Sequence, residues 1–203
     1  MQVIILDMGS GNTCRNDRRI VERMIREIAQ FYTDKVVVLK WQLFKDAPPN
    51  IPLDHECFRY AYDLAWKLGY TTTSSVFDLD SMRFLMQFDV PFVKIACRPD
   101  LYELAQYSTK PVYVSTAQSG LNLPGEVHLA CVRKYPASLA EYEKAFTPQD
   151  LLRVSDHTVG WDLYYKYRPE IIEKHYVHER VPDNPDAGPF AVTPDQLAEV
   201  LGA

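Results

Sequence analysis

The sequence predicts a compact (β/α)8 barrel, and three observations support this prediction. Eight short runs rich in β-branched and apolar residues recur along the chain, and helical patterns separate most of them. Most of these runs begin with a continuous apolar stretch, which is typical of parallel strands buried on both faces. The segment GSGNT after the first strand is only a weak match to a Gly-rich phosphate loop. An open doubly wound sheet, which usually carries such a loop, is therefore the less favoured alternative.

The expected strands alternate with the expected helices over the whole chain. The strands fall at residues 2–9, 35–42, 71–77, 92–98, 111–117, 126–132, 152–158 and 171–178. The first helix, 17–32, carries its apolar residues on one stripe: Ile20, Val21, Met24, Ile25, Ile28 and Phe31. A helix at 54–69 begins with Asp54 as a candidate N-cap and ends at Gly69. Further helical patterns fall at 79–88, 99–108, 138–146, 161–168 and 194–201, the last opened by Thr193 and Pro194.

The connection after the fifth strand is too short for a normal helix. Residues 118–125 read QSGLNLPG, whereas a parallel crossover usually takes a dozen or more residues. We therefore expect a trimmed or missing helix there. The apolar strand surface that such a gap would expose could be covered by a second copy, so we expect a homodimer.

Composition excludes several classes of protein. The net charge is −5, with acidic and basic residues mixed, so a nucleic-acid partner is not expected. No apolar run is long enough to span a bilayer, and the N-terminus lacks a basic leader. The four cysteines are dispersed and read as free thiols, so we expect a cytoplasmic protein without a membrane partner.

Polar side chains collect where the expected strands end. In a (β/α)8 barrel these C-terminal ends converge on one mouth, which holds the active site. Lys94 is notable among them, since a lysine within an apolar strand is costly to bury unless it is paired. The candidates that follow from position are Asp7, Lys40, Gln42, Ser74, Ser75, Lys94, Ser115, Thr116, Arg133, Tyr135, Ser155, Asp156, His157, Glu173, Lys174 and His175. Lys174 should face away from His175, because side chains alternate along a strand.

His157 and His175 form a candidate metal site. They end adjacent strands, so both imidazoles can reach one ion. Two neutral imidazoles with oxygen ligands suit manganese, iron, cobalt or zinc, and Asp7 could complete or support the site. The alternative is that each histidine is a hydrogen-bonded structural residue.

A series of ordered segments resembles the sialic acid synthase (N-acetylneuraminate synthase) family. The most specific are VSDHTVG at 154–160 and IIEKH at 171–175, followed by NPDAGPF at 184–190 and the final TPDQLAEVL. The earlier matches are LDMGSGN, LKWQ, SSVF, VKIACRPDLYELA, KPVYVSTAQS and LACVRKYPA. The resemblance covers nearly the whole chain.

This resemblance implies a metal-dependent condensation of phosphoenolpyruvate with the open-chain aldehyde of an amino sugar. The products would be a sialic-acid-like 2-keto acid and phosphate. By the resemblance, His157 and His175 hold a divalent metal, typically Mn²⁺, and Asp7 holds its water or the substrate. Phosphoenolpyruvate would be bound by Lys40, Ser75, Lys94, Ser115 and Ser155. The sugar would be contacted by Gln42, Tyr135 and Asp186.

The chain departs from the family at several positions. Asp7 stands where the family has Glu, Cys97 where a phosphate-binding Ser is usual, and Arg133 where Asn is usual. Arg133 could hold phosphate or another acidic substrate. We expect residues 1–203 to form a single barrel domain without the family's C-terminal antifreeze-like domain. Two alternatives stay open: a different metal-dependent aldolase or lyase on the same barrel, and a non-catalytic binding descendant.

Overall fold

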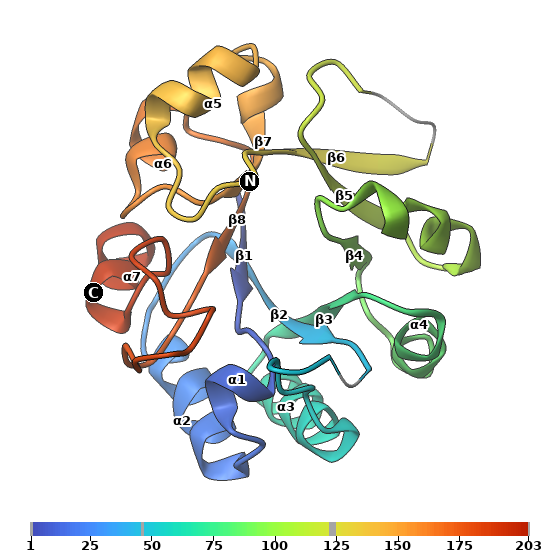
Figure 1. Ribbon diagram of the computed structural model, residues 1–203. Coiled ribbons are helices and arrows are strands. Elements are labelled where there is room, and N and C mark those ends of the chain that lie inside the picture. Colours follow the sequence, from blue (N-terminus) through green and yellow to red (C-terminus); the bar gives the residue numbers. More distant parts are fainter. Residues whose placement is uncertain (1, 46, 122–124, 203) are drawn as a thin grey trace.

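The strands form a closed parallel barrel in sequence order, with β8 paired to β1 (Figure 1). A computed structural model describes residues 2–45, 47–121 and 125–202. The eight strands are β1 (Val3–Asp7), β2 (Val36–Leu43), β3 (Thr71–Val76), β4 (Val93–Ile95), β5 (Val112–Thr116), β6 (Glu126–Cys131), β7 (Arg153–Asp156) and β8 (Ile171–His175). The predicted fold class is therefore confirmed.

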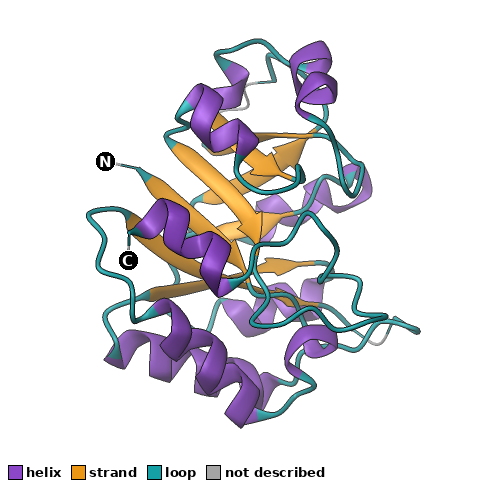
Figure 2. Cartoon of the chain, turned by 90° about the vertical axis from the view of Figure 1, so that its left-hand side faces the viewer, coloured by secondary structure: helices purple, strands orange, loops and turns teal. Residues whose placement is uncertain are grey.

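Helices surround the barrel on its outer side (Figure 2). They are α1 (Gly11–Cys14), α2 (Arg18–Ile28), α3 (His55–Lys67), α4 (Leu79–Leu85), α5 (Leu139–Ala145), α6 (Asp162–Tyr167) and α7 (Pro194–Leu201), with 3-10 helices η1 (Pro99–Tyr107) and η2 (Asp150–Leu152). The segment predicted as a helix at 99–108 is 3-10 rather than α. Its buried residues, Leu101 and Leu104, are three apart, which is the repeat of a 3-10 helix. Across the described residues, no helix is both long and apolar enough to cross a membrane.

The helix starts follow from local sequence signals. The Asp17 side chain accepts a hydrogen bond from the Arg19 amide at the start of α2. Ser138 opens α5 with a capping box completed by Glu141. Thr193 opens α7 with a capping box as well, so the N-cap expected from the Thr-Pro pair is confirmed.

The inside of the barrel changes from apolar to charged along its axis. An apolar plug fills the end at which the strands begin, and it consists of Ile5, Val38 and Phe92 packed against Val3, Val36, Tyr113 and Ile171. Beyond this plug the inward positions become polar, with Lys40, Lys94 and Glu173 all buried. The plug therefore closes the bottom of the barrel and leaves the charged residues at the mouth.

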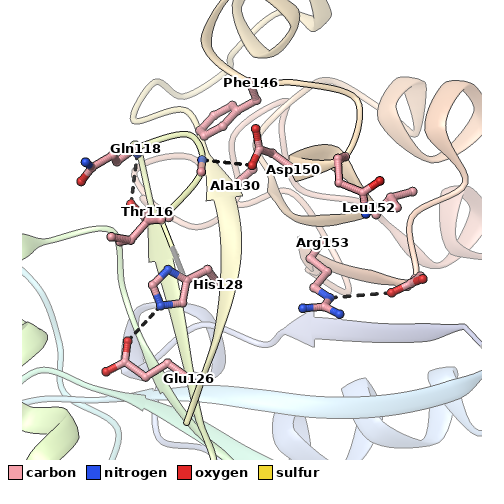
Figure 3. A pocket seen from close by; sticks show the side chains of 13 residues that line it. Thr116, Gln118, Glu126, His128, Ala130, Phe146, Asp150, Leu152 and Arg153 are labelled. Atoms are coloured by element: carbon pink, nitrogen blue, oxygen red, sulfur yellow. Dashed lines mark hydrogen bonds and ion pairs between the residues drawn. The ribbon is translucent and has the colours of Figure 1, made fainter. Parts of the chain in front are cut away.

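The helix predicted to be missing after the fifth strand is indeed absent from the described part of that connection, residues 117–121 and 125. Residues 122–124 lie outside the described residues. A cavity of about 310 Å³ lies over the outer face of β6 instead. Figure 3 shows Glu126 and His128 side by side on β6, with Phe146 and Arg153 from later segments across the cavity.

This uncovered flank is only partly apolar. The Nε2 atom of His128 lies 3.0 Å from the Glu126 carboxylate, and both residues stand on the outer face of β6. The expectation of an apolar strand surface is wrong at these two positions. The reason is that the two polar side chains pair with each other, so both stay mostly buried: the side chain of His128 is 10% exposed and that of Glu126 is 19% exposed. The homodimer stays a prediction.

Removing the Phe92 ring should destabilise the whole barrel. Its ring stacks on Tyr113 at 4.0 Å between centroids, and only 3% of Phe92 is exposed. We expect Phe92→Ala to lower the free energy of unfolding by about 3–5 kcal/mol, because a cavity opens in the plug. Urea unfolding measures this. Tyr32→Ala, at a position that is 96% exposed, is the control and should change it by about 0.5 kcal/mol or less. Equal effects of the two substitutions would contradict the plug.

Candidate active site at the barrel mouth

A cavity of about 540 Å³ opens at the C-terminal ends of the strands. Its walls contain most of the predicted site residues: Asp7, Gln42, Ser75, Lys94, Ser115, Arg133, Tyr135, Ser155, His157, Glu173, His175 and Asp186. Lys40, Ser74, Thr116, Asp156 and Lys174, which were expected at the same mouth, do not line the cavity. All eight strands, or the residues that follow them, supply the lining side chains, and Asp186 comes from the loop after β8. The cavity also contacts residues that sequence analysis did not select, among them Arg98, Cys131, Pro185 and Phe190.

Lys40 lies beneath the cavity rather than in its wall. Its Nζ atom is 2.9 Å from the Asp7 carboxylate and donates to the Ser75 hydroxyl at 2.8 Å. Burial disfavours the charged form of both Asp7 and Lys40, but their mutual attraction outweighs it. The pKa of Asp7 is therefore lowered and the pKa of Lys40 is raised. Lys40 thus holds residues of the wall in place, and its contact with phosphoenolpyruvate stays a prediction.

Lys94 is the buried cation of one half of the cavity. Its Nζ atom donates to the Ser115 hydroxyl at 2.7 Å and to the Ile95 carbonyl at 2.9 Å. It also lies 3.4 Å from the Glu173 carboxylate. The partner that a buried lysine requires is therefore Glu173, which also lies 3.6 Å from Lys40.

Two arginines extend this cationic region. Arg98 and Arg133 both contact the cavity, and an ion pair of 2.5 Å to Asp100 holds the Arg98 side chain. Arg133 is exposed and makes no ion pair within the residues described. We call the set Ser75, Lys94, Arg98, Ser115 and Arg133 the basic half of the mouth.

The opposite side is acidic. Gln42 donates one amide group to both Asp7, at 3.0 Å, and Asp186, at 3.2 Å. Thr13 donates to Asp186 as well, at 3.3 Å. Burial raises the pKa of Asp186. Asp7, Gln42 and Asp186 form the acidic half of the mouth.

The close packing of the acidic half explains a glycine in the first motif. Gly9 has a φ of +72°, and a Cβ there would lie 2.2 Å from the Thr13 hydroxyl and 2.7 Å from the Asp186 carboxylate. No other residue type fits both the backbone conformation and the space. Gly9 therefore lets the chain turn directly after Asp7 and leaves space for the Asp186 carboxylate.

His157 is held by hydrogen bonds on three sides. Its ring Nδ1 lies 2.7 Å from the Val132 carbonyl, its amide donates to the Tyr142 hydroxyl, and its carbonyl accepts from the Ala137 amide. Because a carbonyl can only accept, Nδ1 carries the proton and Nε2 keeps a free lone pair. Burial, with the neighbouring His175 second, lowers the pKa of His157 to about 3. The imidazole is therefore neutral.

His175 lies beside His157 and between two carboxylates. The two ring centroids are 5.8 Å apart. The Nε2 atom of His175 is 3.8 Å from Asp7, and its Nδ1 atom is 3.6 Å from Asp186. That Nδ1 atom is buried and has no hydrogen-bond partner in the described residues. Tyr135 covers the pair from outside, with its ring 4.0 Å from that of His157.

The two histidines fit a divalent cation as protein ligands, but they supply only part of a coordination shell. Within the described ranges, no three or more His, Cys, Asp or Glu side chains converge on one metal position. His157 presents a neutral Nε2 with its Nδ1 bound to a backbone carbonyl, which is the usual arrangement of a metal-ligating histidine. Water or substrate oxygens would fill the remaining positions.

An ion pair behind the barrel wall links the two histidine strands, and sequence analysis did not identify it. Lys174 faces away from His175, as predicted, and its Nζ lies 2.9 Å from the Asp156 carboxylate. Both side chains are completely buried. Lys174 also donates to the Thr158 carbonyl at 2.6 Å, so it binds the chain on both sides of His157. One signal for this pair was present in the sequence. Each of the two residues immediately precedes a histidine, so side-chain alternation places both on the outer face of the barrel.

Tyr142 was also missed. Sequence analysis placed it only within the helix 138–146, and its hydroxyl in fact donates to the Ser155 carbonyl at 2.6 Å and accepts from the His157 amide at 3.0 Å. It is fully buried. Periodicity alone carries no signal for this role, because an inward-facing tyrosine on a helix is an ordinary core residue.

Solved structures share this fold at low sequence identity. No protein-family model and no curated protein matches the sequence. The N-acetylneuraminic acid (sialic acid) synthetase of Leptospira borgpetersenii serovar Hardjo-bovis, solved in complex with citrate, matches with a TM-score of 0.74 and 21% identity over 98% of this chain and 80% of its own. The spore coat polysaccharide biosynthesis protein spsE of Bacillus subtilis matches with a TM-score of 0.71 and 20% identity. That match covers 98% of this chain and 65% of spsE, slightly less than two thirds.

A third solved structure with the same fold has a different name. The phospho-2-dehydro-3-deoxyheptonate aldolase (DAHP synthase) of Thermotoga maritima matches with a TM-score of 0.66 and 12% identity over 98% of this chain and 67% of its own. At these identities the matches establish the barrel fold. They also include a protein named for the family whose motifs the sequence resembles.

Breaking the pair behind the histidines should destabilise the protein strongly. Lys174→Met leaves the Asp156 carboxylate buried without its cation, and we expect a loss of about 3–5 kcal/mol in the free energy of unfolding. Adding Asp156→Asn removes the unpaired charge and keeps an acceptor for Thr158, so the double variant should recover much of that loss. Denaturant titration measures both. A cost below about 1 kcal/mol for Lys174→Met alone would be inconsistent with a fully buried pair.

Proposed function

We propose that this protein is a metal-dependent synthase that condenses phosphoenolpyruvate with an aldehyde sugar. The products are a sialic-acid-like 2-keto acid and inorganic phosphate. The observation that carries the proposal is the division of one mouth cavity into a basic half and an acidic half, with His157 and His175 on the strands between them. The structural likeness to proteins named sialic acid synthetase and DAHP synthase supports it.

The basic half suits phosphoenolpyruvate. This substrate carries a phosphate and a carboxylate, so it needs several cationic and hydroxyl donors in one place. Lys94 supplies a buried ammonium beside the Ser115 hydroxyl, and Arg133 supplies a guanidinium without an ion-pair partner among the described residues. Ser75 and Ser155 line the same cavity with further hydroxyl donors.

The acidic half suits a hydroxyl-rich acceptor. Carboxylate oxygens accept hydrogen bonds from sugar hydroxyls, and Asp7 and Asp186 both line the cavity. The Gln42 amide holds these two carboxylates in fixed positions relative to each other. Tyr135, 54% exposed at the rim, presents an apolar ring face to the same space.

His157 and His175 would hold the metal, with Mn²⁺ the expected ion. A bound divalent cation supplies Lewis-acid polarisation of an aldehyde carbonyl. The residues of the chain then orient the two substrates. The methylene carbon of phosphoenolpyruvate forms a bond to the aldehyde carbon, water adds at the neighbouring carbon, and phosphate leaves from it. Lys94 and Arg133 stabilise the negative charge that the departing phosphate carries.

A different metal-dependent aldolase or lyase on the same barrel is the second candidate. Cys97 in the cavity wall favours it, because a thiol is a weaker hydrogen-bond donor to phosphate than a serine hydroxyl. Arg133 would then bind another acidic substrate. The two candidates differ in whether phosphoenolpyruvate binds.

Phosphate release tests the reaction and the role of His157. We expect the protein with Mn²⁺ to release phosphate from phosphoenolpyruvate when an accepted aldose is present in a panel of N-acetylated amino sugars. His157→Ala should lower that rate at least about 100-fold, and calorimetry should show that Mn²⁺ binding is lost. His128→Ala, outside the mouth, is the matched control and should retain both properties. Unchanged Mn²⁺ binding by His157→Ala would refute the assigned ligand.

Thermal stabilisation by phosphoenolpyruvate tests the basic half. At about 100 times its dissociation constant, a ligand stabilises the native state by about 2.7 kcal/mol, which raises the unfolding temperature. Lys94→Met should abolish this ligand-induced rise, whatever it does to the unfolding temperature of the free protein. Lys67→Met, on the exposed face of α3, should leave the rise intact. A rise with Mn²⁺ but none with phosphoenolpyruvate in the unaltered protein would favour the second candidate.

A further inference from the structure

The four cysteines fall into two groups with different surroundings. Cys14 and Cys57 belong to α1 and α3, outside the barrel, and burial raises the pKa of both thiols, that of Cys14 to about 12. Cys97 and Cys131 instead line the mouth cavity. All four are free thiols. The proposed reaction uses none of them.

Cys97 and Cys131 meet across the end of β5. Cys97 follows β4 by two residues and Cys131 is the last residue of β6, and these two strands flank β5. The two side chains interact, and this interaction lowers the pKa of Cys97 and raises that of Cys131. Cys97 is 9% exposed and Cys131 is 1% exposed, so Cys97 is the more accessible of the two.

Cations surround Cys97 in this corner. Arg133 and Lys94 line the same cavity, and positive charge favours a thiolate. The interaction with Cys131 is the largest effect on Cys97. Burial opposes it, and the charges of Arg133 and Lys94 reinforce it, so that the pKa of Cys97 falls to about 7. The titratable groups that face the two sulfurs are Lys94, Tyr102, Arg133 and Glu173.

We propose that Cys97 is a site of covalent modification by soft electrophiles and peroxides, with Cys131 as its partner thiol. Two features support it: Cys97 and Cys131 both line a cavity that a small reagent can enter, and Lys94 and Arg133 line the same cavity, where their positive charge favours a thiolate. Neither phosphoenolpyruvate nor a metal takes part, so the reactivity of Cys97 is independent of the proposed reaction.

With hydrogen peroxide the chemistry balances in two steps. The Cys97 thiolate attacks one peroxide oxygen, a sulfur–oxygen bond forms, the oxygen–oxygen bond breaks, and hydroxide leaves. The sulfur is oxidised by two electrons to a sulfenic acid. The Cys131 thiol then attacks this sulfur, and a disulfide forms as water leaves. Any group added to Cys97 would lie beside Lys94 and Arg133, where it would fill the basic half of the mouth.

Alkylation of the native protein tests the reactivity of Cys97. The protein is treated with iodoacetamide over a range of pH, and the label on each cysteine is followed by peptide mass spectrometry. We expect Cys97 to react first, with a rate that rises through a midpoint near its lowered pKa of about 7. Cys14 and Cys57 are internal controls and should react only after unfolding. In Arg133→Met the midpoint should move upward by about one pH unit.

A peroxide experiment tests the partner. Brief exposure of the native protein should give a Cys97–Cys131 disulfide, seen as the loss of two hydrogens in the joined peptides. In Cys131→Ala the oxidation should stop at a sulfenic acid on Cys97, which dimedone traps. Failure of Cys97 to react with either reagent at about pH 8, while the unfolded chain reacts, would overturn the proposal. Earlier modification of Cys14 or Cys57 in the folded protein would overturn it equally.

Discussion

A network of four buried charges underlies the whole mouth of this barrel. Asp7, Lys40, Lys94 and Glu173 come from β1, β2, β4 and β8, and their side chains meet inside the closed sheet. Each of these groups would be costly to bury alone. The network therefore requires the barrel to close in this register, and the apolar plug beneath it keeps the charges at one end. Lys94 and Asp7 reach the cavity as parts of a balanced set, one in the basic half and one in the acidic half.

The histidine pair is positioned from behind by groups that never reach the cavity. Asp156 and Lys174 join β7 to β8 outside the barrel, immediately before His157 and His175. Tyr142 binds the backbone on the other side of β7. The amide, the carbonyl and the Nδ1 atom of His157 are all hydrogen-bonded. Only its Nε2 atom keeps a free lone pair, and the backbone contacts fix the orientation of the ring. In the proposed metal site, these contacts would hold the His157 ring in position before an ion binds.

The short connection between β5 and β6 lies away from the residues that position the two histidines. Between β5 and β6 the described residues contain no helix, and Glu126 and His128 stand on the outer face of β6. The mouth cavity still receives Ser115 from β5 and Cys131 from β6. A (β/α)8 barrel can lose part of its outer layer in this way, because the inward side chains of a strand depend on its pairing with neighbouring strands. On the outer face of β6, the contact between Glu126 and His128 then takes the place of a helix contact.

Local patterns in the sequence are enough to predict the order of strands and helices, the short connection after β5 and most of the residues in the cavity wall. These follow from local patterns: apolar runs, helix caps, and the rule that strand C-termini form the mouth. The tertiary structure alone decided which of these residues are available. In the folded barrel, Lys40 lies below the mouth cavity and Lys94 pairs with Glu173. Lys174 pairs with Asp156, and Cys97 lies near Cys131. Each of these contacts links residues far apart in the chain, so it depends on barrel closure and register, which no local pattern specifies.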